Sequence, residues 1–304
     1  MKKVLITLSL ITICFSCKNQ SKDANGKLEV VTTTSMITDL VTNIGGEHIS
    51  IQGLMGSGVD PHLYKASEGD VSKLANADLI FYNGIHLEGK LVEVFEKMHS
   101  QNIKTEAIAD GIDHNTLISS SLFQGNFDPH IWFDIQYWKE ATRFVVAKLS
   151  EAVPEQKVVF ESNGELYIKK LDALEVKIKS IIATLPEDKR ILVTAHDAFS
   201  YFGRAYGFEV VGLQGLSTAT EAGVQDVQKL AAFIIEKKIK AVFIESSVPK
   251  RTIEALQAAV NSKKNDVEIG GTLYSDALGN AGTIEGTYIG MFEYNVNTIV
   301  NALK

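Results

Sequence analysis

Short apolar runs alternate with amphipathic stretches along most of the chain. Seven apolar runs predict β-strands, at Leu28–Thr34, Ile49–Leu54, Asp78–Tyr82, Arg190–Thr194, Glu209–Leu213, Ala241–Glu245 and Glu268–Leu273. Five stretches with apolar residues three or four positions apart predict helices, at Thr38–Ile44, Lys90–His99, Gln136–Ala152, Gln225–Lys238 and Val248–Asn261. Strands that alternate with helices indicate parallel sheets with crossover helices, so the predicted fold class is α/β. The sequence shows no internal repeat.

One segment, Pro154–Leu185, breaks this alternation, because its apolar residues keep helical spacing much longer than in the other stretches. Pro154 suits a first helical turn, and Pro186 supplies a stop. A helix of this length would measure roughly 45 Å, far more than a crossover needs. Gly164 in its interior costs about 1 kcal/mol relative to alanine and marks a candidate kink.

We interpret this segment as a rigid connector between two lobes. The expected boundaries are 28–153 for an N-terminal α/β lobe, 154–186 for the connecting helix and 187–304 for a C-terminal α/β lobe. The length of 304 residues favours two lobes, because it exceeds what one hydrophobic core usually fills. The alternative is a long surface helix on one large domain.

The N-terminus has the pattern of an export signal. Two lysines precede an apolar run from Val4 to Phe15, which is too short to span a bilayer. Ser16 stands directly before Cys17, as in a bacterial lipobox, although Cys14 occupies the position where leucine is usual. We expect a signal peptide at 1–16, a lipidated Cys17 that anchors the protein outside the cytoplasm, and a polar tether at 17–27. Secretion without an anchor is the alternative.

Cysteine usage and charge restrict the function of the body. The chain has only 2 cysteines, Cys14 and Cys17, so the body contains no disulfide framework, thiolate metal site or cysteine nucleophile. The net charge is −7, and removal of the signal would leave 28 basic and 37 acidic side chains, a net charge of −9. Because nucleic-acid binding needs a basic stripe, we expect no nucleic-acid partner.

Three histidines and one aspartate are candidate metal ligands. His62 and His130 each end an Asp-Pro-His motif, His196 lies at the end of an apolar strand, and Asp276 stands just past another. Loops at the carboxyl ends of strands are where α/β folds bind ligands, so we expect these side chains in a cleft between the lobes. Nitrogen and oxygen ligands suit zinc, manganese, iron or nickel, and the absence of thiolates disfavours copper(I). On spacing alone, ordinary surface or core histidines are the alternative.

Four acidic residues are candidates to support these ligands. Asp60, Asp128 and Asp197 stand close to a histidine in sequence and could orient its second ring nitrogen, although each could equally cap a turn or a helix. Glu245 ends a strand beside the expected cleft and could bond a ligand or link the lobes. The remaining histidines are expected to be bystanders: His48, His86, His99 and His114.

Seven ordered blocks cover the body from about Leu28 to the C-terminus and carry a family resemblance. They are Gly53–Tyr64 (GLMGSGVDPHLY), Asn76–Gly84 (NADLIFYNG), Phe127–Asp134 (FDPHIWFD), Val193–Phe202 (VTAHDAFSYF), Phe243–Ser247 (FIESS), Ser275–Gly279 (SDALG) and Glu285–Tyr288 (EGTY). The body resembles the metal-binding solute-binding lipoproteins of zinc and manganese ABC importers, the TroA/ZnuA-like family of cluster A-I, and is most similar to the TroA type. The resemblance implies two small α/β lobes with parallel sheets, joined by one long rigid helix.

The resemblance also implies a function and a ligand set. By position, the ligands would be His62, His130, His196 and Asp276. The protein would capture a divalent metal outside the cytoplasm and deliver it to a membrane permease with an ATPase subunit, so it would not be an enzyme. We expect a monomer.

The resemblance leaves the metal open between zinc and manganese, with iron a further possibility. His196 stands where manganese-dedicated members often carry glutamate, whereas the histidine-rich loop of many zinc-dedicated members is missing between Asp110 and Phe127. Intrinsic affinity favours zinc, so zinc is our expectation and manganese follows closely. Two alternatives are a secreted zinc hydrolase, against which no His-Glu-x-x-His motif occurs, and an adhesion lipoprotein without a transport role.

Overall fold

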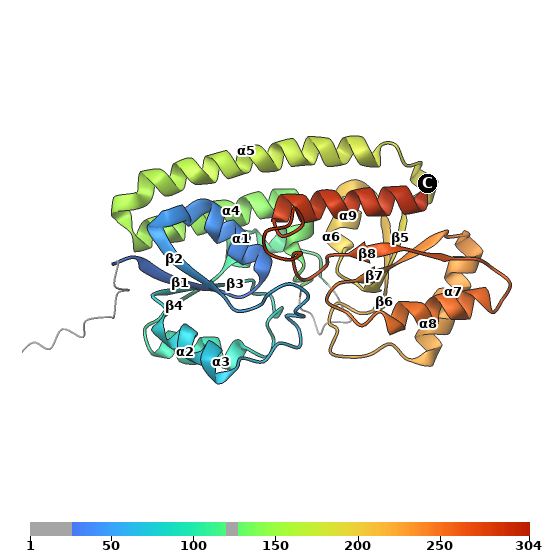
Figure 1. Ribbon diagram of the computed structural model, residues 1–304, viewed down its shortest axis with the longest axis horizontal. Helices are drawn as coiled ribbons and strands as arrows, with labels where there is room; N and C mark the ends of the chain where they lie inside the picture. Colours follow the sequence, from blue (N-terminus) through green and yellow to red (C-terminus); the bar gives the residue numbers. More distant parts are fainter. Residues whose placement is uncertain (1–25, 120–126) are drawn as a thin grey trace, which may run out of the picture.

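The computed structural model describes residues 26–119 and 127–304, which form two α/β lobes side by side beneath one long helix (Figure 1). Both lobes contain parallel sheets, so the predicted fold class is confirmed. Among the residues described, no helix combines the length and the apolar character that a bilayer span requires. The predicted signal peptide, Cys17 and most of the tether lie outside these ranges.

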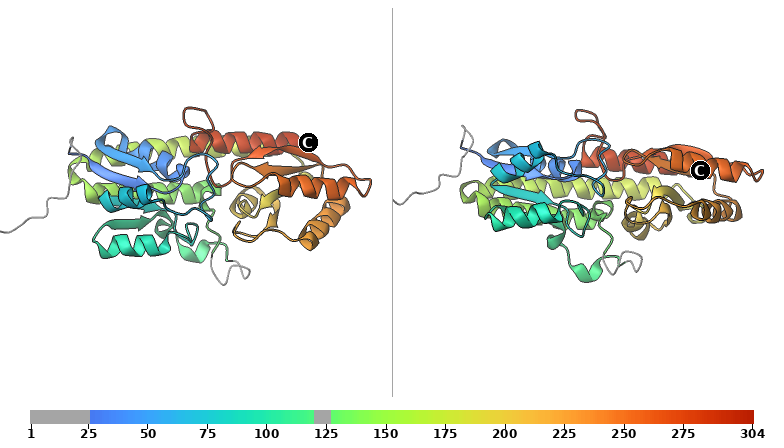
Figure 2. Two further views of the ribbon diagram at one scale, coloured as in Figure 1. Left: turned by 60° about the horizontal axis from the view of Figure 1, so that its bottom comes forward. Right: turned by 90° about the horizontal axis from the view of Figure 1, so that it is seen from below.

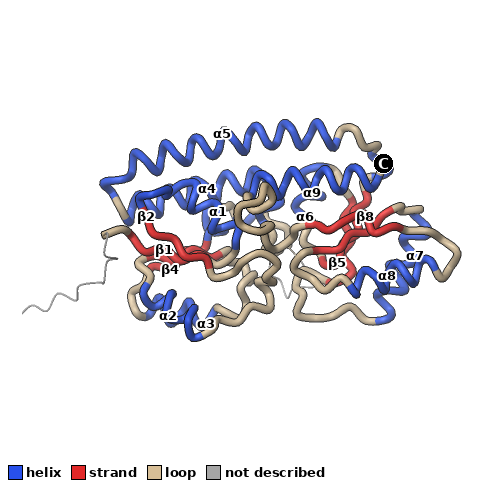
Figure 3. The backbone as a smooth tube through the Cα atoms, viewed as in Figure 1, coloured by secondary structure: helices blue, strands red, loops and turns tan. Residues whose placement is uncertain are grey.

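The N-terminal lobe is built on a four-stranded parallel sheet with the order β2-β1-β3-β4. Its strands are β1 (Leu28–Thr32), β2 (Ile49–Gly53), β3 (Leu79–Tyr82) and β4 (Lys104–Ala107). Its helices are α1 (Ser35–Gly45), α2 (Glu68–Asn76), α3 (Val92–Ser100) and α4 (Ile135–Ala152). Successive residues of a strand point to opposite faces, so Val30 joins the core under α1 and α4 while Val31 joins the core with α2 and α3. Helices therefore cover both faces of the sheet (Figures 1 and 3).

The C-terminal lobe contains two two-stranded parallel sheets. Its strands are β5 (Ile191–His196), β6 (Glu209–Gln214), β7 (Ala241–Glu245) and β8 (Glu268–Leu273). Its helices are α6 (Ser200–Tyr206), α7 (Val224–Lys237), α8 (Arg251–Asn261) and α9 (Tyr288–Leu303). The pairs β5-β6 and β7-β8 are both parallel, and β5 lies beside β7, so the spatial order is β6-β5-β7-β8. This order is the same as in the first lobe, and helices again cover both faces (Figure 3).

The predicted elements agree with the structure to within three residues at their ends, and four elements were not predicted. The edge strand β4 was missed because Lys104 and Glu106 interrupt any apolar run. The helices α2, α6 and α9 were also missed, and α9 is apolar on most sides, which hides its periodicity. Short 3-10 turns fill the connections, at Gly46–His48, Ile108–Gly111, His114–Thr116, Ile131–Phe133, Pro154–Gln156 and Glu187–Lys189.

The long helix α5 spans Lys157–Ile182 and packs along both lobes (Figures 1 and 2). Its length is about 39 Å at 1.5 Å per residue. One stripe of the helix is buried, with spacings of three and four residues, at Phe160, Gly164, Tyr167, Leu171, Leu174, Ile178 and Ile182. This stripe contacts α1 and α4 in the first lobe and α9 in the second. The core beneath α5 is continuous between the lobes, so the boundaries at 153 and 187 stay our proposal.

Gly164 brings α5 close to α4, and the helix continues through this position without a break. A Cβ atom at this position would collide with the Cγ2 atom of Val146 on α4. The glycine therefore contributes close helix packing, which offsets the propensity cost of about 1 kcal/mol.

The close approach of Gly164 to Val146 predicts that Gly164→Ala changes the free energy of unfolding in opposite directions in the wild type and in a Val146→Ala background. We expect Gly164→Ala alone to lower the free energy of unfolding by about 1 to 2 kcal/mol, because the new methyl group overpacks against Val146. In a Val146→Ala background, the same change should raise stability by up to about 1 kcal/mol through helix propensity. Urea unfolding of the four proteins followed by circular dichroism gives the coupling. Destabilisation of equal size in both backgrounds would contradict the packing explanation.

Candidate metal centre

The four candidate metal ligands come from distant parts of the chain and meet between the lobes. His62 lies in the loop after β2, His130 directly precedes the 3-10 turn at Ile131–Phe133, His196 is the last residue of β5, and Asp276 follows β8. One nitrogen or oxygen atom from each lies within 4.8 Å of the others, and all four side chains are buried. The first two come from the N-terminal lobe and the last two from the C-terminal lobe.

The ring nitrogens and the carboxylate point toward a common centre. The Nε2 atoms of His62 and His130 are 3.3 Å apart. The Nε2 atom of His130 is 3.6 Å from Oδ1 of Asp276, and that of His196 is 3.3 Å from Oδ2. Three imidazole nitrogens and one carboxylate therefore face one another, with separations of 3.3 to 3.6 Å between the atoms named, and this set of donors suits zinc or manganese.

The two Asp-Pro-His motifs fold into the same turn. In each, the aspartate Oδ1 accepts a hydrogen bond from the backbone N–H of the histidine, at 2.8 Å for Asp60 and 2.9 Å for Asp128. The motifs then differ. Asp128 Oδ1 also lies 2.7 Å from Nδ1 of His130, whereas Asp60 Oδ2 accepts a 2.5 Å hydrogen bond from Thr218 in the other lobe. Asp128 therefore orients an imidazole, and Asp60 shapes a turn and links the lobes.

Glu245 holds the third histidine from β7. Its Oε2 lies 2.6 Å from Nδ1 of His196, and its Oε1 accepts the backbone N–H of His196 at 2.9 Å. Asp197, the fourth acidic candidate, instead accepts a hydrogen bond from Ser200 at 2.8 Å, and no histidine ring is hydrogen-bonded to it among the described residues. Of the two roles considered for Asp197, the structure supports the local one at the start of α6.

Five buried polar atoms at or beside the centre have no hydrogen-bond partner in the described part of the chain: Nδ1 and Nε2 of His196, Oδ1 of Asp276, Oε2 of Glu245 and Oδ2 of Asp128. Nδ1 of His196 and Oε2 of Glu245 are 2.6 Å apart as an ion pair, which leaves Nε2 of His196 and Oδ1 of Asp276 to consider at the centre itself. Leaving buried polar atoms unpaired is costly, and native proteins usually do so only for a reason. Both atoms are metal donors and both face the centre, so the residues fit a divalent cation.

Two histidines at the centre, His62 and His196, have pKa values shifted in opposite directions. Burial lowers the pKa of His62 to about 3, so this ring is neutral at neutral pH. Burial alone would also lower the pKa of His196, but the carboxylates of Asp276 and Glu245 outweigh it and raise the pKa well above its ordinary value. Burial would raise the pKa of Asp276, but the neighbouring imidazoles, His196 foremost, hold it below its ordinary value. A charged pair of His196 and Asp276 thus stands where a cation would bind.

Two aromatic residues, Trp132 and Tyr201, hold the loops that carry the candidate ligands. Trp132 Nε1 donates to the backbone carbonyl of Ser275 at 2.9 Å, and the Tyr201 hydroxyl donates to that of Asp128 at 2.8 Å. Both bonds cross between the lobes beside a candidate ligand. Both residues stand in the same sequence blocks as candidate ligands and are therefore candidates to wall the site, although plain core packing is the more common role of aromatic residues.

A second support comes from a buried carboxylate. Glu88 accepts hydrogen bonds from the Thr33 hydroxyl and the Asn83 backbone N–H, both at 2.7 Å. The Asn83 side chain in turn donates to the carbonyl of Pro129 at 2.9 Å, one residue before His130. The only signal for this support is Asn83 at the end of a matched block.

The remaining histidines lie apart from the centre. His86, His99 and His114 are exposed and His48 is half-buried.

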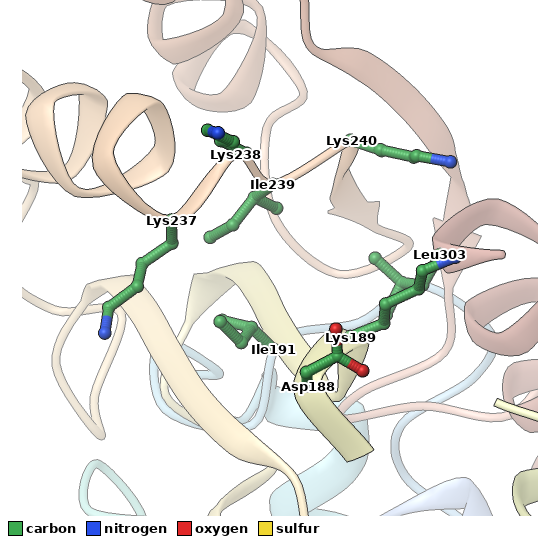
Figure 4. Close-up of a pocket in the computed structure, with 8 residues that line it drawn as sticks. All are labelled: Asp188, Lys189, Ile191, Lys237, Lys238, Ile239, Lys240 and Leu303. Carbon is green, nitrogen blue, oxygen red and sulfur yellow. The ribbon is translucent and has the colours of Figure 1, made fainter. Parts of the chain in front are cut away.

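A pocket of about 240 Å³ lies at the amino-terminal ends of β5 and β7 (Figure 4). Ile191 and Ile239 form its apolar floor, and the lysines around it point in different directions, so no ligand set converges there.

Three relatives of this chain are described as metal-binding or metal-transport proteins. The chain is 48% identical over 305 residues to the manganese-binding lipoprotein MntA of Bacillus subtilis, covering 100% of this chain and 98% of the relative. It is 50% identical over 285 residues to the zinc-binding protein TroA of Treponema pallidum, covering 93% and 92%. It is 32% identical over 313 residues to the metal ABC transporter substrate-binding lipoprotein SsaB of Streptococcus sanguinis, covering 100% and 99%.

A solved structure and a family model extend the comparison. The structure of the periplasmic zinc binding protein TroA from Treponema pallidum superposes with a TM-score of 0.89 at 49% identity, covering 91% of this chain and 99% of that chain. The model of the family described as zinc-uptake complex component A, periplasmic, matches residues 30–302. The resemblance deduced from the sequence blocks is therefore confirmed, and the chain belongs to this ZnuA family.

Proposed function

We propose that the protein is an extracytoplasmic solute-binding protein that captures a divalent transition metal and delivers it to an ABC importer. The observation that carries this proposal is the convergence of His62, His130, His196 and Asp276 within 4.8 Å of one another. The metal is the cargo of this protein and not a cofactor. Its partners would be a membrane permease and an ATPase subunit, and it would act as a monomer without nucleic acid.

We propose zinc as the preferred cargo, with manganese close behind. Three imidazoles and one carboxylate oxygen complete a tetrahedral zinc shell, and zinc exceeds manganese in intrinsic affinity for such donors. Manganese prefers more oxygen donors. The second oxygen of Asp276 could supply one, because it lies only 3.3 Å from Nε2 of His196. Among the relatives, MntA is described as manganese-binding and TroA as zinc-binding, so family membership does not separate the two ions.

A hydrolytic role is less well supported. Catalytic zinc sites hold the ion with three protein ligands and keep a fourth position open for water. Here Asp276 supplies a fourth donor facing the same centre as the three histidines. The relatives compared above are described as metal-binding or substrate-binding proteins. An adhesion role has no specific observation in its favour.

We also propose that Cys17 anchors the protein by lipidation after removal of residues 1–16. The support is the Ser16-Cys17 pair behind an apolar run, together with the description of MntA and SsaB as lipoproteins. Two acyl chains suffice for stable membrane attachment.

Removing one ligand tests the metal site. We expect His196→Ala to weaken zinc binding on the order of 100-fold or more, because it removes a donor and leaves Glu245 and Asp276 without their shared partner. Competition titration against a chelator, together with metal content after purification, measures the change. His99→Ala is the matched control, since His99 is exposed on α3. A wild-type protein that binds neither zinc nor manganese would defeat the proposal.

The opposed pKa values predict proton release. The raised pKa of His196 means that this ring carries a proton at pH 7 in the metal-free protein, whereas His62 does not. Metal binding requires the neutral ring, so we expect zinc binding at pH 7 to release protons and the affinity to fall as pH falls. Calorimetry in buffers of different ionisation enthalpy measures the release. Zinc binding without proton release would contradict the raised pKa of His196.

The anchor is tested in the producing bacterium. We expect Cys17→Ser to move the protein from the membrane fraction to the soluble fraction and to abolish incorporation of labelled palmitate. Zinc affinity of the purified body should stay unchanged, because residue 17 precedes the described lobes. Membrane retention of the variant at the wild-type level would contradict lipidation.

A further inference from the structure

The carboxylate of Asp276 has two unequal oxygens. Oδ1 is buried without a hydrogen-bond partner in the described part of the chain and lies 3.6 Å from Nε2 of His130. Oδ2 accepts a hydrogen bond from the Ser247 hydroxyl at 3.2 Å and also lies 3.3 Å from Nε2 of His196. Both oxygens therefore face imidazole nitrogens of the centre, but only Oδ2 accepts a hydrogen bond from a hydroxyl group.

Ser247 is fixed in place by its surroundings. Its hydroxyl also lies 3.0 Å from the hydroxyl of Ser275, which is buried and precedes Asp276 directly. The segment that carries Ser247 begins at the end of β7, two residues after Glu245, which holds His196. A single short segment thus contacts both C-terminal-lobe ligands, one through Glu245 and one through Ser247.

A hydroxyl that donates to Oδ2 weakens this oxygen as a metal donor. With Oδ1 and three imidazoles the ion finds four good donors, the number that zinc prefers. Manganese is a harder ion that gains more from additional oxygen donors, so it loses more when Oδ2 is occupied. The hydrogen bond should therefore penalise manganese more than zinc.

We propose that Ser247 is a specificity-determining residue, which favours zinc over manganese by occupying the second oxygen of Asp276. It acts through Asp276 and is a positioning residue, not a ligand. This inference rests on the proposed metal-binding function and adds the choice of ion to it.

The test compares Ser247→Ala with three further variants of the full body. Ser247→Thr keeps the hydroxyl, and Ser247→Cys replaces it with a weak donor of similar size. Ser200→Ala is the matched control, because its hydroxyl bonds Asp197 and no ligand. Zinc and manganese dissociation constants are measured by competition for each protein.

We expect Ser247→Ala to shift the ratio of zinc to manganese affinity toward manganese by about tenfold, in the range of changes beside metal ligands. Ser247→Cys should shift it in the same direction, while Ser247→Thr and Ser200→Ala should keep the wild-type ratio. Cobalt(II) provides a second readout, because four-coordinate cobalt absorbs visible light more strongly than five-coordinate cobalt. The cobalt absorption should weaken in Ser247→Ala and persist in Ser247→Thr.

The outcomes separate the two proposals. If the wild-type protein binds neither zinc nor manganese, the proposed function fails. If the wild type binds metal but Ser247→Ala and Ser247→Cys keep both the affinity ratio and the cobalt spectrum, only the role of Ser247 is overturned. Equal loss of affinity for both ions would also overturn it, because a merely structural defect would not distinguish zinc from manganese.

Discussion

The structure depends on holding one carboxylate, that of Asp276, among three imidazoles away from water. A buried carboxylate is costly unless it is paired, and here His196 supplies the positive charge in the absence of a cation. Two further acids, Asp128 and Glu245, lie against the outer ring nitrogens of His130 and His196 and turn the inner nitrogens toward the centre. Three carboxyl groups, of Asp128, Glu245 and Asp276, therefore surround the three imidazoles. In the function proposed above, a divalent cation would take over the role that the positive charge of His196 has between Asp276 and Glu245.

Ligands that come from two lobes keep their spacing only if the lobes are held firmly together. The buried stripe of α5 contacts helices of both lobes, and the core beneath it runs without a break from α1 to α9. Close to the centre, two hydrogen bonds cross between the lobes: Trp132 donates to Ser275, directly before Asp276, and Tyr201 donates to Asp128, two residues before His130. A frame of this kind resists wide opening, because separating the lobes would expose a shared core.

Much of this arrangement is predictable from the sequence, and the rest has physical reasons for being hidden. The apolar runs located β1, β5 and β7 because strands buried on both faces are apolar throughout. The edge strand β4 alternates with charged residues and gives no such signal. The Asp-Pro-His motifs pointed to His62 and His130. The aspartates of the two motifs have different partners, Thr218 for Asp60 and the His130 ring for Asp128, and this difference depends on the three-dimensional arrangement of the loops. Glu88 and Ser247 act through contacts that short-range patterns cannot reveal. The ligand assignment itself stays a prediction until a metal is bound.

The two lobes share a topology that the sequence does not display. Each has four strands in the same spatial order, as one parallel sheet in the first lobe and as two parallel pairs in the second, and each ends in a helix, α4 or α9, that packs against α5. His130 precedes α4 and Asp276 precedes α9, so these two ligands hold equivalent places in the two lobes. A shared burial pattern suffices to keep the topology, which is why no repeat of residues is needed. At equivalent places, however, one lobe offers an imidazole and the other a carboxylate. The strands and helices of the two lobes are thus arranged alike, whereas the candidate ligands at equivalent places differ. This difference gives the centre a single carboxylate donor, Asp276. Its hydrogen-bond partner Ser247 also belongs to the C-terminal lobe.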